Sequence, residues 1–133
     1  IAAMARNGTP MLGTCAGMIL LSTRIADGDE PVFGLLDIEV TRNGYGRQLD
    51  SFETELETPS LGNQPMHAVF IRAPMVTSVG DAAEVLATDP DGRPVAVRQG
   101  NLLATAFHPE LTDDTRVHRR FLELVEEELH VRA

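Results

Sequence analysis

Apolar and polar residues alternate along the chain in short blocks that predict helices towards both ends and strands between them. The apolar residues 1–6, followed by Asn7 and Gly8, indicate the end of a helix, because both residues tolerate the left-handed turn that closes one. Residues 9–13, bounded by proline and glycine, predict a buried strand, and residues 16–24 predict an apolar helix. This order of strand, sharp turn and helix is half of a parallel βα unit.

The middle of the chain is rich in predicted strands. After a loop at residues 27–31, short apolar runs occupy residues 35–40, 52–57, 68–71, 84–88, 94–98 and 102–107. The turn sequence Asp89-Pro90-Asp91-Gly92 predicts that the runs on either side of it form an antiparallel pair. Residues 114–129 have apolar positions at helical spacing and predict an amphipathic helix, with Thr112 or Asp113 as its N-cap. These elements predict an α/β fold of three layers with a largely parallel sheet.

The composition fits one globular domain and argues against several classes of function. Of the 133 residues, 43% are hydrophobic and 23% charged, and no apolar stretch approaches the roughly 20 residues that cross a bilayer. The net charge of −9 disfavours binding to nucleic acid. All 11 basic residues are arginine, so any Schiff-base chemistry must use a lysine of another chain. The single cysteine cannot form an internal disulfide, and a cytoplasmic location is therefore predicted.

The first candidate for chemistry is the segment Gly13-Thr14-Cys15-Ala16-Gly17, which has the form of a nucleophile elbow. Side chains at the two glycine positions are expected to collide with the neighbouring strand and helix. The start of the following helix favours a thiolate at Cys15, and the backbone N–H of Ala16 is a candidate oxyanion donor. The alternative is a buried structural cysteine between two turn glycines, the commoner situation for an isolated cysteine.

The second candidate is His108, which lies at the end of a predicted strand and is followed by Pro109 and Glu110. Residues two apart in an extended segment point the same way, so Glu110 is placed to orient the His108 ring while Pro109 keeps the backbone extended. A cysteine, a histidine and an orienting carboxylate form a set for covalent catalysis. Neither a metal site nor a cofactor is predicted.

Four segments together carry a resemblance to a known family. They are residues 10–21 (PMLGTCAGMILL), 34–52 (GLLDIEVTRNGYGRQLDSF), 70–74 (FIRAP) and 107–111 (FHPEL). The first and last resemble class I glutamine amidotransferases in general, which have a flavodoxin-like fold. The two middle segments are similar to the glutaminase subunits of pyridoxal 5′-phosphate synthase. The resemblance extends from about residue 9 to the end of the chain.

The resemblance implies a role for each candidate residue. Cys15 would be the nucleophile, His108 the base that activates it and later protonates the leaving ammonia, and Glu110 the group that orients His108. Contacts to the substrate, L-glutamine, would come from Arg42, Ile71 and Arg72. Guanidinium groups bind carboxylates well, although a structural ion pair is the ordinary role of an arginine. The ammonia would pass to a synthase subunit, the partner in a hetero-oligomeric complex that makes vitamin B6.

One part of the family pattern has no match in residues 1–10. The resemblance implies an upstream Gly-Gly-Glu-Ser type loop, which completes the oxyanion hole, together with opening strands. We therefore expect residues 1–133 to form a single glutaminase domain that lacks its N-terminal part and its first strands, and to be inactive alone. Two alternatives stay open: another class I amidotransferase or cysteine hydrolase, and a truncated chain that serves as a non-catalytic binding partner.

Overall fold

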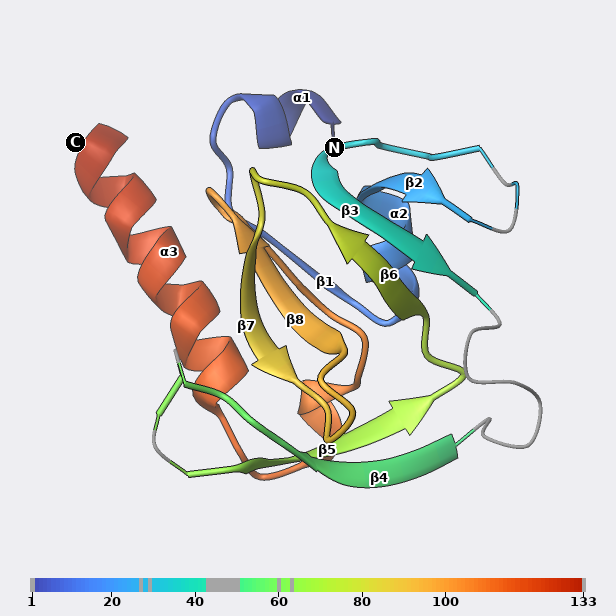
Figure 1. Ribbon diagram of the computed structural model, residues 1–133. Helices are drawn as coiled ribbons and strands as arrows, with labels where there is room; N and C mark the ends of the chain where they lie inside the picture. Colours follow the sequence, from blue (N-terminus) through green and yellow to red (C-terminus); the bar gives the residue numbers. More distant parts are fainter. Residues whose placement is uncertain are drawn as a thin grey trace.

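The predicted strand, elbow and helix around Cys15 are present in the computed structural model, which describes residues 2–26, 28, 30–42, 51–59, 61–62 and 64–132 (Figure 1). After α1 (Ala2–Arg6), β1 (Met11–Thr14) leads through Cys15 into α2 (Ala16–Leu21). The elements that follow are β2 (Ser22–Ile25), β3 (Leu36–Thr41), β4 (Ser51–Leu56), β5 (Met66–Ile71), β6 (Met75–Val79), β7 (Glu84–Thr88), β8 (Pro94–Gln99), β9 (Leu102–Thr105), the 3₁₀ helix η2 (Pro109–Leu111) and α3 (Arg116–Arg132).

The described strands form three sheets, with orders β1-β9-β8-β7, β2-β3-β6 and β4-β5. The pairs β1–β9 and β2–β3 are parallel, whereas β3–β6, β4–β5, β7–β8 and β8–β9 are antiparallel. The α/β class is confirmed, including the antiparallel pair around Asp89 to Gly92, but these sheets are mixed where a largely parallel one was predicted. The physical reason is that short turns join β7 to β8 and β8 to β9, and such turns can connect only antiparallel neighbours.

Two strands differ from the predicted pattern. The helix predicted to reach Arg24 ends at Leu21, and the following residues form β2. Ser22 ends the helix because it is extended, with ψ 150°, and its hydroxyl donates to the Ile19 carbonyl at 2.8 Å. The strand β6 was not predicted, because it is short and exposes the polar residues Thr77 and Ser78. Both strands pair with β3.

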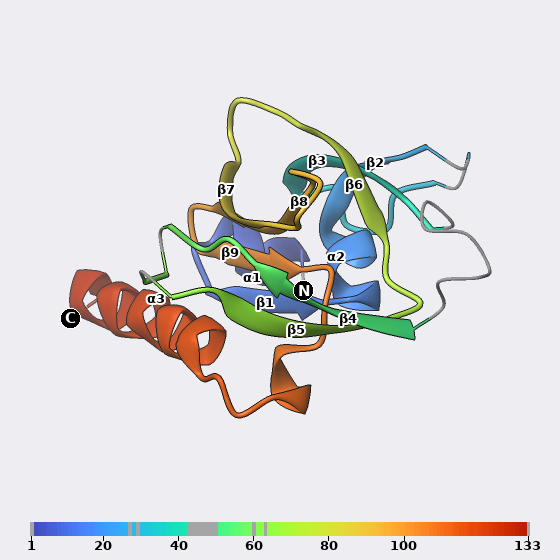
Figure 2. The ribbon, with the colours of Figure 1, turned by 60° about the horizontal axis from the view of Figure 1, so that its bottom comes forward.

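The core lies between the strands and the two longer helices. Figures 1 and 2 show α3 on one side of the four-stranded sheet and α2 on the other. Leu36, Ile38 and Val40 alternate along β3 and are fully buried. Each such side chain contributes about 1.5–3 kcal/mol by leaving water. No helix among the described residues has the length and apolar character needed to cross a membrane.

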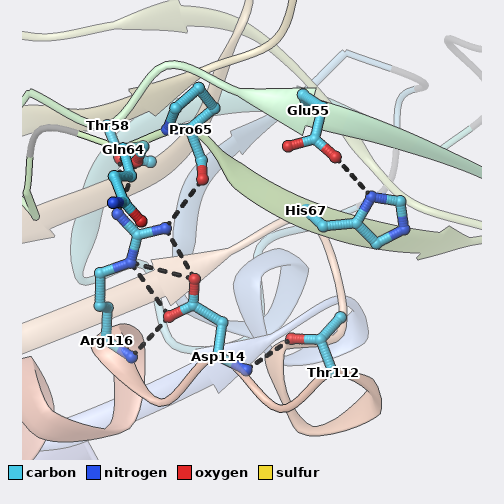
Figure 3. A network of polar contacts seen from close by, with 8 residues as sticks. All are labelled: Glu55, Thr58, Gln64, Pro65, His67, Thr112, Asp114 and Arg116. Atoms are coloured by element: carbon cyan, nitrogen blue, oxygen red, sulfur yellow. Dashed lines mark hydrogen bonds and ion pairs between the residues drawn. The ribbon is translucent and has the colours of Figure 1, made fainter.

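The start of α3 is fixed by a polar network (Figure 3). Asp114 caps the helix by accepting a hydrogen bond from the Arg116 backbone N–H at 3.0 Å. The prediction of Thr112 or Asp113 as N-cap is therefore wrong; the Thr112 hydroxyl instead accepts from the Asp114 N–H at 3.3 Å. The Arg116 guanidinium lowers the pKa of Asp114 and also donates to the Gln64 carbonyl at 2.7 Å. This arginine thereby ties α3 to the connection between β4 and β5.

Candidate active site

The backbone at Cys15 has the strained geometry of a nucleophile elbow. Cys15 has φ 54° and ψ −108°, a conformation that costs a residue with a side chain about 1–3 kcal/mol. Its backbone N–H donates to the Thr105 carbonyl at 2.8 Å, which fixes the elbow to the end of β9. A Cβ added at Gly13 would lie 2.7 Å from the Gly17 carbonyl oxygen, so only glycine fits there. The expected collision at Gly17 is wrong, because no described atom lies within 4 Å of a Cβ built at that position.

The Cys15 thiol has a raised pKa and a hydrogen-bond partner in this structure. Its Sγ donates to the Ile71 carbonyl at 3.4 Å. Burial raises the pKa of the thiol, and the nearby Glu110 carboxylate raises it further, while the Ala16 N–H acts in the opposite direction without overcoming them. The predicted stabilisation of a thiolate by the helix start is therefore present but outweighed. The Ala16 N–H is directed at the sulfur, and its role as an oxyanion donor stays a prediction.

His108 and Glu110 form the predicted pair. The His108 Nδ1 lies 2.9 Å from a carboxylate oxygen of Glu110. The expected extended backbone continues only through His108, because Pro109 begins the 3₁₀ helix η2, and the turn still brings Glu110 against the ring. The pKa of Glu110 is lowered: burial acts to raise it, but its own backbone N–H and His108 outweigh that effect. A carboxylate that stays ionised is suited to holding an N–H of the imidazole.

The Cys15 thiol and the backbone of His108 both contact the same edge of β5. The His108 backbone N–H donates to the Val69 carbonyl at 2.9 Å, and the next carbonyl on that edge, that of Ile71, accepts from Cys15. No hydrogen bond joins the Cys15 thiol to the His108 ring in the described structure, although the sequence predicted that they lie within such reach. Sites of this kind often tighten only when substrate is present.

The three residues expected to contact substrate lie at the ends of strands. Ile71, the last residue of β5, is 39% exposed, and Arg72 follows it with φ 47° and an exposed side chain. The Arg72 carbonyl lies 4.0 Å from the Cys15 sulfur. Arg42 directly follows β3 and is exposed. The remainder of the family-like segment, residues 43–50 with Arg47 and Gln48, lies outside the described residues.

Sequence reasoning missed two residues that hold the site together. Val69 contributes a carbonyl to His108, and no sequence signal marks a backbone acceptor. Thr105 contributes a carbonyl to Cys15, and its buried hydroxyl donates to the Phe107 carbonyl at 2.8 Å. A signal for Thr105 exists, because it is a polar residue inside the apolar run that leads to His108. The described residues contain no group of three or more His, Cys, Asp or Glu side chains suited to hold a metal ion.

A strained cysteine between a strand and a helix, with a His–Glu pair at the end of the adjacent parallel strand, defines the fold and site of class I glutamine amidotransferases. The SNO glutamine amidotransferase family matches residues 1–127, and the chain belongs to this family. The family and fold expected from the sequence are thereby confirmed.

Individual relatives and solved structures agree with this placement. The chain is 60% identical over 123 residues to the pyridoxal 5′-phosphate synthase subunit PdxT of Herpetosiphon aurantiacus, covering 90% of this chain and 65% of that protein. It is 57% identical over 122 residues to the subunit of the same name from Moorella thermoacetica, covering 92% and 64%. The chain thus spans somewhat less than two thirds of the length of these relatives.

A solved glutamine amidotransferase superimposes with a TM-score of 0.83 at 47% identity, covering 92% of this chain and 65% of that chain. PurLQS from Thermotoga maritima superimposes with a TM-score of 0.68 at 15% identity, covering 93% and 66%. At that identity the likeness shows the fold alone.

Proposed function

We propose that the chain is the glutaminase subunit of a pyridoxal 5′-phosphate synthase. It would hydrolyse L-glutamine to glutamate and ammonia through a cysteine acyl-enzyme and deliver the ammonia to a synthase subunit. The observation that carries this proposal is the juxtaposition, on one edge of β5, of the strained Cys15 and of His108 with its carboxylate partner Glu110. The names of the relatives, subunits of pyridoxal 5′-phosphate synthase, support the choice of synthase.

In the first half of the reaction, His108 takes the proton of the Cys15 thiol and the sulfur attacks the side-chain amide carbon of glutamine. The bond between sulfur and carbon forms while the carbonyl oxygen gains negative charge, which the Ala16 N–H stabilises. Because the pKa of the resting thiol is raised, the nucleophile has to be generated by this transfer. The tetrahedral intermediate collapses as the C–N bond breaks, and the His108 imidazolium returns the proton to the departing nitrogen as ammonia.

In the second half, a water molecule replaces ammonia. His108 takes a proton from the water, the hydroxide attacks the thioester carbon, and the C–S bond breaks to release glutamate. The His108 imidazolium returns its proton to the departing sulfur, which restores the Cys15 thiol and the neutral base. Glu110 keeps Nδ1 of the ring protonated and leaves Nε2 for proton transfer, because the 2.9 Å contact involves Nδ1. The ring is thereby held in one tautomer through both halves.

Two arginines at strand ends are suited to hold the amino-acid part of the substrate. A free amino acid presents an α-carboxylate, and a planar guanidinium binds a carboxylate through two hydrogen bonds. Arg72 directly follows the strand whose edge contacts the thiol, and Arg42 follows β3, whose Thr41 pairs with Met75 just beyond Arg72. We assign both arginines to the α-carboxylate and Ile71 to the wall of the site.

The composition of these 133 residues supports a synthase partner. They contain no lysine that could form a Schiff base with a sugar phosphate, and we assign that step to a second subunit. Ammonia released into water would be protonated and lost, which favours a docked complex in which the product does not reach bulk solvent. A reducing cytoplasm suits the free thiol on which the reaction depends.

The substitution Cys15→Ala tests the proposal in the complete subunit, assembled with its synthase. Glutamine hydrolysis should fall to background, while synthesis of pyridoxal 5′-phosphate from added ammonia should continue at the wild-type rate. The second assay is the control, because it requires a folded complex but no glutaminase. Wild-type protein without glutaminase activity, or Cys15→Ala protein with it, would contradict the proposal. Glutaminase activity that is equal with and without the synthase would instead indicate another amidotransferase of the same class.

A further inference from the structure

A continuous set of hydrogen bonds leads from the backbone of Cys15 to its side chain through the segment that carries His108. The Cys15 N–H donates to the Thr105 carbonyl at 2.8 Å, and the Thr105 hydroxyl donates to the Phe107 carbonyl at 2.8 Å. The next residue, His108, donates its N–H to Val69 at 2.9 Å. Two residues further along the same strand, the Ile71 carbonyl accepts from the Cys15 thiol. The set therefore begins at the backbone of Cys15 and ends at its side chain.

The peptide unit between Phe107 and His108 is held at both ends. Its C=O accepts from the Thr105 hydroxyl, and its N–H donates to Val69. Because a peptide unit is planar and includes the Cα atoms on both sides, fixing its C=O and N–H also fixes the position of the His108 Cα, from which the side chain extends. The position of the imidazole therefore depends on two bonds, of which only the one from Thr105 comes from a side chain.

Thr105 is placed where its hydroxyl has a defined partner. The side chain is fully buried at the last position of β9, opposite Thr14 of the elbow strand. Beyond it the chain leaves the four-stranded sheet and reaches the edge of β5, where the Phe107 ring lies 5.8 Å from the Phe70 ring. The Thr105 hydroxyl stabilises this change of direction through its hydrogen bond to the carbonyl of Phe107, two residues further along the chain.

We propose that Thr105 is a positioning residue of the reaction, whose hydroxyl sets the orientation of His108 relative to Cys15. The expected effect of Thr105 on glutamine turnover rests on the proposed glutaminase function. Its expected effect on the reactivity of the Cys15 thiol does not. Thr105 does not contact substrate; it acts by orienting the peptide unit that precedes the base. Loss of the hydroxyl should leave substrate binding intact and slow the proton transfers.

The test compares Thr105→Val, which replaces the hydroxyl with a methyl group, and Thr105→Ser, which retains it. Both are prepared in the complete subunit in complex with the synthase. Thr58→Val is the matched control: Thr58 is also buried, and its hydroxyl donates to a backbone carbonyl, that of Gln64, at the opposite end of the β4–β5 pair. The measurements are kcat and KM for glutamine, and the pH profile of Cys15 alkylation by iodoacetamide. Mass spectrometry of the peptide with Cys15 follows the only thiol of this chain.

Thr105→Val should lower kcat by roughly 10- to 100-fold with KM within about threefold of wild type, because small misplacements of a catalytic group have effects of this size. Its alkylation profile should move towards that of His108→Asn, which lacks the base. Thr105→Ser should restore both readouts to within about threefold, and Thr58→Val should leave the profile unchanged. If Thr105→Val does not fold, Thr105→Ala removes the same hydroxyl with a smaller side chain.

The proposal would be overturned if the alkylation profile and kcat of Thr105→Val matched those of the wild type. It would also be overturned if Thr105→Ser were as impaired as Thr105→Val, since packing would then explain the loss. A shift of the same size in Thr58→Val would assign the effect to general loosening of the fold. A wild-type complex without glutaminase activity would contradict the proposed function, and the alkylation profiles would still decide the role of Thr105.

Discussion

At the scale of single residues, Cys15 combines a strained backbone with a thiol of raised pKa. Positive φ at a residue with a side chain persists only where surrounding contacts enforce it, and here the Thr105 carbonyl and the absence of a side chain at Gly13 do so. Burial, and then Glu110, raises the pKa of the thiol, whereas the thiolate is the reactive form of a cysteine. Under the proposed function, the thiolate is therefore generated by proton transfer to His108.

The two glycines of the elbow offer a matched pair of substitutions. Gly13→Ala should destabilise the chain by about 1–3 kcal/mol, because the new Cβ would lie 2.7 Å from the Gly17 backbone oxygen. Gly17→Ala should be neutral or stabilise by up to about 1 kcal/mol, because this position is helical and open to the described residues. Urea unfolding at unchanged m-value measures both. Equal effects of the two substitutions would show that the elbow does not need its first glycine.

Sequence reasoning identified these residues with uneven success. Cys15, His108 and Glu110 could be proposed from the sequence because side chains of these types and spacing are unusual, and the structure shows the contact between His108 and Glu110. The different constraints on Gly13 and Gly17 were not found, since both read as small residues next to a nucleophile. Which of them meets a neighbouring backbone depends on the path of α2 across β1, and this is a property of packing.

At the scale of elements, the two edges of β5 make different contacts. The Val69 and Ile71 carbonyls face away from β4 and hold His108 and Cys15, while Phe70, between them, faces β4 and stacks on Phe52 at 4.6 Å. His67 lies two residues before Val69, so its backbone N–H and C=O also point away from β4. His67 and Glu55 therefore form a pair without backbone hydrogen bonds, and in such pairs the two side chains lie closer together. β5 is therefore joined to β4 by the antiparallel ladder and by side-chain contacts on both faces, the buried Phe70–Phe52 stack and the exposed His67–Glu55 pair.

The pair of strands β4 and β5 carries a pH-dependent contact on its outer face. The two ring nitrogens of His67 lie 2.8 Å from Glu55 and 2.7 Å from Glu53 (Figure 3 shows the former). Both nitrogens donate only when the ring is protonated, and these bonds, to Glu53 first and then to Glu55, raise the pKa of His67. Because the pKa of His67 is raised in the folded state, protonation of the ring stabilises the fold. This stabilisation is fully present below the unfolded-state pKa of about 6.5 and is lost as the pH rises through the folded-state pKa.

His67→Gln should therefore lower the melting temperature at about pH 6 and have little effect at about pH 9. The effect should be small, because the three side chains are exposed to solvent, and it should weaken in high salt. Thermal unfolding at the two pH values measures it. His130→Gln, on the exposed last turns of α3, is the control for loss of a histidine away from the β4–β5 pair. A larger loss for His67→Gln at the alkaline pH would show that the sign is wrong.

The elements themselves were predicted where local signals are strong. The turn between β7 and β8 and the long helix α3 follow from proline, glycine and helical spacing. β2 was taken as helix because the apolar run of α2 continues into it, and only pairing with β3 decides that Ser22 to Ile25 are extended. The mixed sheets have two origins: short turns make β7–β8 and β8–β9 antiparallel, and the β3–β6 pair joins strands that are further apart in sequence.

At the scale of the whole molecule, an apolar groove follows the outer edge of β1. It has a volume of about 450 Å³ and is bordered by residues of α1, β1, α2 and α3, among them Met4, Leu12, Leu20 and Phe121. β1 is the last strand of its sheet in the described part of the chain. An uncovered apolar patch beside an open strand edge favours association with other surfaces.

We expect a protein of these 133 residues to self-associate through this groove. Leu20 is 41% exposed on it, and Leu20→Glu should weaken association by about tenfold or more, because burying a leucine contributes about 1.5–3 kcal/mol. Leu129→Glu is the control, since Leu129 is 64% exposed but lies near the end of α3, outside the groove. Sedimentation equilibrium over a range of concentrations measures both. A wild-type chain that stays monomeric, or equal effects of the two substitutions, would contradict the expectation.

The doubly held peptide unit before His108 has a consequence for the exchange of its amide hydrogen with solvent. His108 lies outside the described helices and strands, and amide hydrogens in such segments ordinarily exchange quickly with solvent. Its bond to Val69 and the buried Thr105 hydroxyl on the other side of the same unit predict slow exchange instead. Protection at this one position would report how rigidly the base is held before any substrate arrives.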